Sequence, residues 1–199
     1  MDDNIAKNVQ ELNDKRTRYE ILSQCIKELQ IKRNTIWQFI ICPILSLIIG
    51  VCVAFKSNAL EISQNIMSMF LDVSLALFAV ILGAYAVFQA LMRDEIIKEL
   101  IKSKDNILRI SNRTFLNLSL LHIINIFITV FVSILVMICD DEFYIYSILF
   151  SNIAYAVLLT AYCTFNFLII LENINFVINL YRMFNVYNIY RALDVVDKE

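Results

Sequence analysis

The sequence predicts an all-α membrane protein with four transmembrane helices and helical cytoplasmic extensions. Of its 199 residues, 59% are hydrophobic and only 18% are charged. Soluble domains usually contain about 45–50% apolar and about 25% charged residues, so this composition is typical of a membrane protein. Four apolar stretches also reach the roughly 20 residues that a helix needs to cross about 30 Å of hydrocarbon.

Each apolar stretch is predicted to be one membrane span, and together they form a transmembrane domain over residues 35–171. Only the second stretch contains a charged residue, which is Asp72, and Glu172 follows the end of the fourth. The four stretches are 35–55, 66–92, 114–139 and 143–171.

The basic residues predict the orientation of these spans. Of the 17 lysines and arginines, 16 lie in the N-terminal segment, in the loop 93–113 or in the C-terminal tail, and only Lys56 lies on the other side. Cytoplasmic loops carry the excess of basic residues, so both termini are expected in the cytoplasm and the bilayer is expected to be the inner (plasma) membrane. The outer loops are short, so a soluble partner is expected on the cytoplasmic face.

Residues 1–34 are predicted to form one amphipathic helix that continues into the first span. Three environments are open for its apolar stripe: the chain's own cytoplasmic helices, a coiled coil with a second copy, or the membrane surface. The stripe follows a seven-residue period and consists of Ile5, Leu12, Tyr19, Leu22, Ile26 and Leu29.

Two further cytoplasmic elements are expected. Residues 93–113 are predicted to form a helical hairpin that turns at residues 104–106. Residues 172–199 are predicted to form a C-terminal helix with an aromatic face and an acidic tail. The aromatic face is either packed internally or offered to a partner. Acidic residues balance the basic ones in the hairpin, so direct binding of nucleic acid is not expected.

Small residues form two stripes at helical spacing. Because helices gain little from hydrophobicity when they associate in lipid, small residues mark the faces where helix backbones approach closely. The facing helix can belong to the same chain or to another copy, and the sequence leaves both open. The stripe of the second span consists of Ala76, Ala79, Gly83, Ala86 and Ala90; that of the first consists of Cys42, Ser46, Gly50 and Ala54.

The polar residues within the spans are the candidates for a sensor or a pore. Asp72 lies on the small stripe of the second span and is either an interfacial acid or a pore-mouth or sensor carboxylate. One face of the third span carries His122, Asn125, Thr129 and Ser133. This face serves either interhelical hydrogen bonding or a hydrated pore, and His122 is a candidate pH sensor. Other residues that can join an interior network are Gln89, Asn152 and Asn166.

The composition also excludes several chemistries. Two glycines cannot supply a phosphate-binding loop, and one histidine cannot build a multi-histidine metal site. No nucleophile–base–acid set and no pair of catalytic carboxylates is found. The five cysteines fit no metal motif and are expected to be reduced, buried thiols. The sequence therefore predicts no enzyme, no cofactor and no metal.

The four-span layout, the N-terminal helix and the segment 79–91 resemble the membrane subunit of bacterial antiphage defence systems of the Kiwa type. The four-span accessory proteins of some RNA-targeting CRISPR loci are similar too. The resemblance implies that this chain is the membrane partner of a soluble DNA-binding effector. In that role the membrane protein senses a disturbance of the envelope, and it has no catalytic residues.

Two functions are therefore predicted. The first is a non-enzymatic membrane sensor or scaffold that forms homo-oligomers and recruits a cytoplasmic protein. The alternative is a pore-forming effector that depolarises the cell when triggered.

Overall fold

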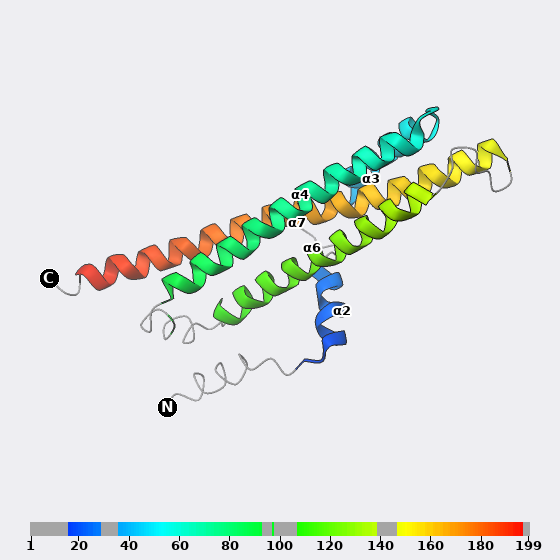
Figure 1. Ribbon diagram of the computed structural model, residues 1–199. Helices are drawn as coiled ribbons and strands as arrows, with labels where there is room; N and C mark the ends of the chain where they lie inside the picture. Colours follow the sequence, from blue (N-terminus) through cyan, green and yellow to red (C-terminus); the bar gives the residue numbers. More distant parts are fainter. Residues whose placement is uncertain (1–15, 29–35, 93–96, 98–106, 139–146, 197–199) are drawn as a thin grey trace. The chain divides into compact units, whose positions relative to one another are not determined.

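The computed structural model describes residues 16–28, 36–92, 97, 107–138 and 147–196. These residues form five helices, and no strand occurs among them (Figure 1). The helices are α2 (Arg18–Glu28), α3 (Gln38–Ala54), α4 (Ala59–Leu91), α6 (Ile107–Ile138) and α7 (Ile148–Val196). The all-helical class predicted from the composition is confirmed.

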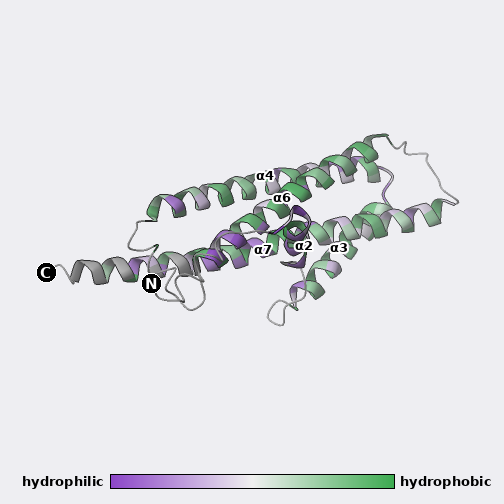
Figure 2. Ribbon diagram, turned by 90° about the horizontal axis from the view of Figure 1, so that it is seen from below, coloured by the Kyte–Doolittle hydropathy of each residue, from purple (hydrophilic) through white to green (hydrophobic). Residues whose placement is uncertain are grey.

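Three of these helices are long and apolar enough to cross a membrane, namely Ala59–Leu91, Leu108–Ile138 and Ile148–Tyr181. Apolar residues dominate along them, whereas α2 is mainly hydrophilic (Figure 2). Helix α3 is shorter than the 35–55 span predicted from the sequence, because Ile36 and Trp37 form a turn and the helix has 17 residues. At 1.5 Å per residue it is about 25 Å long.

The expected single helix over residues 1–34 is not found in the described part of that segment. Arg16 and Thr17 are not helical, and α2 begins at Arg18. The backbone N–H of Thr17 donates to Glu20 Oε2 at 2.7 Å, and the backbone N–H of Glu20 donates to Thr17 Oγ1 at 3.3 Å. This reciprocal capping box starts a new helix at that point. The turn at Ile36–Trp37 then precedes α3, so α2 does not run unbroken into the first apolar helix.

The buried residues of the three long helices recur every three or four positions. The spacing matches the alternating three- and four-residue pattern of packed helices in left-handed bundles. The core face of each helix is thus a seven-residue repeat that mixes apolar and polar side chains. Helix α4 buries Ser63, Met67, Phe70, Ser74, Ile81 and Phe88; α6 buries Leu108, Ser111, Phe115, Leu118, His122, Asn125 and Thr129; α7 buries Leu159, Tyr162, Asn166, Ile169, Asn173 and Phe176.

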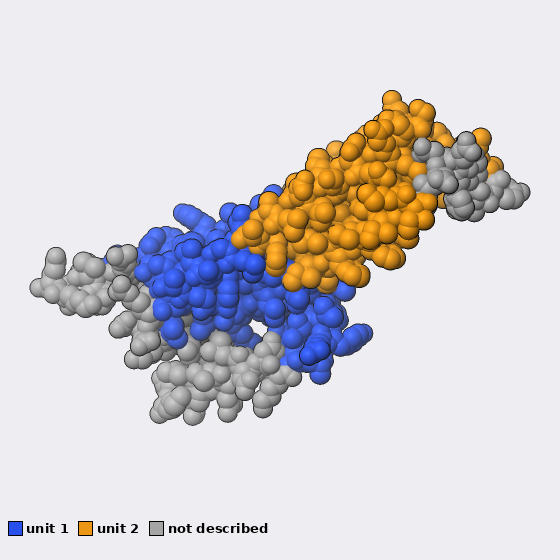
Figure 3. Space-filling model, in the orientation of Figure 1, with its two compact units in different colours: residues 1–28, 80–120, 173–199 blue, residues 29–79, 121–172 orange. Residues whose placement is uncertain are grey.

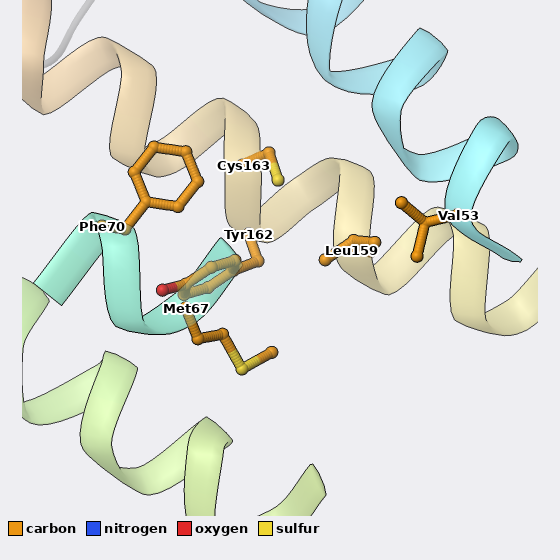
Figure 4. Close-up of a cluster of buried hydrophobic side chains, with 6 residues drawn as sticks. All are labelled: Val53, Met67, Phe70, Leu159, Tyr162 and Cys163. Atoms are coloured by element: carbon orange, nitrogen blue, oxygen red, sulfur yellow. The ribbon is translucent and has the colours of Figure 1, made fainter. Parts of the chain in front are cut away.

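The chain divides into two compact units, coloured separately in Figure 3. Unit 2 comprises residues 29–79 and 121–172. Its apolar core joins α3, α4 and α7 through Val53, Met67, Phe70, Leu159, Tyr162 and Cys163 (Figure 4). The ring of Phe70 packs edge-on against Tyr162 at 5.9 Å and against Phe167 at 5.3 Å between centroids.

Helix α3 packs on α7 through the small stripe predicted for the first span. Cys42, Ser46, Gly50 and Ala54 are all buried. A Cβ atom added to Gly50 would lie 2.3 Å from Thr160 Oγ1 and 2.8 Å from the carbonyl oxygen of Ala156. The Thr160 hydroxyl also donates to the Ser46 carbonyl at 3.4 Å. A glycine is therefore required at position 50 by a helix of the same chain.

Unit 1 comprises residues 1–28, 80–120 and 173–199. Here Cys25 of α2 is fully buried, and its Sγ donates to the carbonyl of Asn117 in α6 at 3.0 Å. Three further aromatic rings surround Phe115 and join α4, α6 and α7. The Phe115 centroid lies 5.0 Å from Tyr85, 5.8 Å from Phe88 and 5.1 Å from Phe176.

The contact at Gly50 yields a prediction about stability. We expect Gly50→Ala to lower the free energy of unfolding in detergent by about 1–3 kcal/mol, because the added methyl group overlaps Thr160 and the Ala156 backbone. The measurement is unfolding by a denaturing detergent, followed by helical circular dichroism.

The matched control is Cys52→Ala, since Cys52 is exposed on α3 outside the small stripe. This variant should unfold at the same detergent concentration as the unmodified chain, or at a higher one. Equal stability of the two variants would contradict the packing described for α3 and α7.

Candidate functional site

The candidate site predicted on the third span is a buried polar network in unit 2. His122, Asn125 and Thr129 of α6 are each at most 1% exposed. The side-chain amide of Asn125 donates to Ser74 Oγ of α4 at 2.7 Å and to Asn166 Oδ1 of α7 at 2.9 Å. Through these two hydrogen bonds, a single residue connects three helices.

The network continues along α7. Asn166 Nδ2 donates to the carbonyl of Tyr162 one turn earlier at 3.0 Å, and the Tyr162 hydroxyl donates to Thr129 Oγ1 at 3.0 Å. A separate pair lies further along, where the Tyr155 hydroxyl donates to Ser63 Oγ at 2.6 Å. The polar face of α6 is thus directed at α4 and α7 of its own chain.

The chemistry available to this network is limited. Its members in hydrogen-bond contact are amides and hydroxyls, which carry no charge and join helices without activating a nucleophile. Among the residues that the structure describes, no group of three or more His, Cys, Asp or Glu side chains is placed to hold a metal ion. Asn125 Oδ1 is buried and accepts no hydrogen bond from a described residue, so the network retains one unused acceptor.

The sequence analysis found part of this network. It named His122, Asn125, Thr129 and Asn166, of which the last three are joined by hydrogen bonds directly or through Tyr162. It did not assign Tyr162 or Ser74 to the network. The available signal was the seven-residue spacing of Tyr155, Tyr162 and Ile169 on α7, which places these tyrosines on the buried face.

Asp72 lies outside the network. Its side chain is exposed on α4, whereas Ser74, two residues later, is buried and bonded to Asn125. The small stripe of α4 is exposed along its whole length at Ala76, Ala79, Gly83, Ala86 and Ala90. Ile81 and Phe88 are buried on the opposite face of the same helix. Asp72 and the stripe therefore share the outward face of α4.

The predicted apolar seam of the N-terminal segment is also exposed where it is described. Tyr19 is 81% exposed, and Leu22 and Ile26 are exposed as well. Helix α2 contacts α6 through Cys25, which is not a seam residue. The other seam positions, Ile5, Leu12 and Leu29, lie outside the described residues, as does most of the predicted hairpin 93–113.

The cysteines of the described residues are free thiols. Cys25, Cys42 and Cys163 are buried, whereas Cys52 is exposed on α3. The expectation that the cysteines are buried is therefore wrong for Cys52, because this residue lies on the face of α3 that points away from α7.

Comparison with protein-family models, with curated proteins and with solved structures found no match.

The central position of Asn125 yields the second prediction. We expect Asn125→Leu, which keeps the branching of the side chain at Cγ but removes its amide, to lower the free energy of unfolding by about 1 kcal/mol. The reason is that two interhelical hydrogen bonds are lost at roughly 0.6 kcal/mol each. The measurement is the same detergent unfolding, with Ser133→Ala as control, because Ser133 lies at the partly buried end of the same face. Equal stability of Asn125→Leu and the unmodified chain would contradict a structural role for the network.

Proposed function

We propose that this chain is a non-catalytic scaffold or sensor subunit of the bacterial inner membrane. It self-associates within the bilayer and holds a cytoplasmic protein partner. Both termini lie in the cytoplasm, where 16 of its 17 basic residues are concentrated. Helix α3 is a fourth span in this arrangement. Its apolar side chains on the face away from α7 are exposed, among them Ile40, Ile44 and Ile48, which supports contact with lipid.

The observation that carries the proposal is the outward small stripe of α4. Of the two glycines in the chain, Gly50 is required by a helix of the same chain, whereas Gly83 faces open space. Small residues in a membrane helix favour close approach of a second helix, and none of the helices that the structure describes packs against this face. A second copy of the chain can pack against the stripe, because the stripes of the two copies then face each other across a two-fold axis.

Asp72 adds an energetic reason for the same arrangement. A carboxylate costs about 2.5–3.5 kcal/mol at the centre of a bilayer on insertion scales and less toward the interface, where Asp72 lies near the start of the apolar stretch 66–92. Residues of this type usually face the interior of a bundle. Asp72 is exposed in the single chain and lies on the stripe side of α4. Self-association through this face removes the side chain from lipid.

A scaffold is favoured over the alternative of a pore by the hydrogen bonds of α6. The polar residues that a pore would need as its lining, Asn125 and Thr129, are buried and bonded to helices of their own chain. Opening a conducting path along this face would break those bonds.

The surface proposed for the cytoplasmic partner includes the exposed face of α2. Tyr19, Leu22 and Ile26 lie on one side of a helix that is attached to the rest of unit 1 through Cys25. Apolar positions at this spacing are typical of a helix that docks into a groove of another protein. The resemblance to antiphage membrane subunits makes a soluble DNA-binding effector the partner to test.

Self-association is tested at Gly83. We expect Gly83→Leu to shift the protein from oligomer to monomer, because the added side chain holds the facing helix away, whereas a Cβ atom at this position meets no described atom of its own chain within 4 Å. The readout is the mass of the protein–detergent complex by light scattering. Val80→Leu is the control, since Val80 is exposed on α4 outside the stripe. Oligomers that persist in Gly83→Leu would overturn the role of the stripe.

Partner binding is tested on α2. The double substitution Tyr19→Ser and Ile26→Ser should abolish co-purification of the cytoplasmic partner with the full-length chain, while leaving its detergent unfolding unchanged. Both side chains are exposed, so the fold does not depend on them. The control is Lys27→Gln, an exposed position on the same helix. If the double variant still co-purifies with the same partner, α2 is not part of the binding surface.

A further inference from the structure

The first turns of α6 carry a cation at the boundary of the apolar stretch. From Thr114 to Ile138 the helix contains no Asp, Glu, Lys or Arg. At 1.5 Å per residue this stretch is about 37 Å long, which exceeds the roughly 30 Å of the hydrocarbon core. Arg113 is the first charged residue beyond it. In a membrane, Arg113 therefore lies at the depth of the lipid headgroups.

The side chain of Arg113 is partly buried, and its hydrogen-bonding capacity is not used up within the described residues. The Nε atom is buried and donates to no acceptor there, and the same holds for the neighbouring acceptor Asn112 Oδ1. A buried guanidinium N–H without an acceptor costs free energy, since it loses its hydrogen bond to water and gains none in return. A donor and an acceptor on consecutive residues thus both lack a partner at the headgroup level.

Carboxylates do not account for this cation in the described part of unit 1. The only described acidic side chain of the unit is Glu20, and it accepts a hydrogen bond from the Thr17 backbone within the capping box of α2. Arg109 lies one turn before Arg113 and is exposed, so a second positive charge stands on the same side of α6.

The aromatic cluster of unit 1 marks the same level. Phe115, two residues after Arg113, packs against Tyr85 of α4, which remains partly accessible. Tyrosines are enriched where a membrane meets water, because the ring prefers the apolar side and the hydroxyl the wet side. The position of Tyr85 supports placing this end of α6 among the headgroups.

We propose that Arg113 binds the phosphate group of an anionic phospholipid in the leaflet where α6 begins. Binding requires the partly buried side chain to turn toward the lipid, where the planar guanidinium offers Nε and a terminal nitrogen in the geometry that matches two phosphate oxygens. Asn112 Oδ1 accepts a hydrogen bond from a headgroup hydroxyl, which selects a glycerol headgroup such as that of phosphatidylglycerol. Arg109 adds attraction to the negatively charged leaflet.

The experiment is a lipid titration of the purified full-length protein in a neutral detergent, read by native mass spectrometry. The lipids are phosphatidylglycerol and phosphatidylcholine, and inorganic phosphate is titrated separately. Arg113→Gln should weaken phosphatidylglycerol binding about five- to tenfold, because one basic residue near the surface is worth about 1 kcal/mol or somewhat more. Arg18→Gln, which removes the same charge from an exposed position on α2, should leave the affinity unchanged.

Three results would overturn the proposal. The first is an unchanged affinity for phosphatidylglycerol in Arg113→Gln. The second is an equal affinity of the unmodified protein for phosphatidylglycerol and phosphatidylcholine, a measurement that does not depend on the folding of any variant. The third is displacement of the lipid by inorganic phosphate at equal concentration, which would assign the site to free phosphate. Arg113→Lys, which keeps the charge and loses Nε, should bind with intermediate affinity.

Discussion

The hydrogen bonds of Asn125 are the constraint on which the helix arrangement of unit 2 depends. This amide joins α6 to Ser74 of α4 and to Asn166 of α7. In a membrane the apolar surfaces of helices differ little from lipid, so hydrophobicity alone does not fix how one helix lies along another. A buried amide does fix it, because a shift by one turn would leave donor and acceptor without partners. The edge-on packing of Phe70 against Tyr162 and Phe167 then has one register available.

The same constraint orients the outer surfaces of these helices. Once Ser74 of α4 faces α6, the residues on the other side of α4 face away, and these are Asp72 and the small stripe around Gly83. The inward and outward faces of α4 thus have different roles. One packs the single chain through apolar and hydroxyl side chains, and the other offers the flat backbone that a second copy would need.

Charged residues lie at the ends of α6 and α2. The span of α6 contains no Asp, Glu, Lys or Arg up to Arg113. The capping box at Thr17 and Glu20 marks the start of α2. The proposed scaffold therefore has three surfaces of different chemistry. These are a small-residue face within the bilayer, a cationic position at the headgroups, and the apolar face of α2 on the cytoplasmic side of the bilayer.

The sequence by itself determined the helical membrane class, the positions of three long apolar helices, and which residues share a face, because these follow from composition and from helical periodicity. It also contained the capping signal at Thr17 and Glu20, although the seven-residue period of Tyr19 and Ile26 favoured one long helix. Only the tertiary structure decided which small stripe is used within the chain. Gly50 and Gly83 both lie in stripes of small residues, but Thr160 of α7 lies against one, whereas no described atom lies within 4 Å of a Cβ atom at the other. Spacing defines a face, whereas the neighbour of that face depends on hydrogen bonds such as those of Asn125 between helices far apart in the sequence.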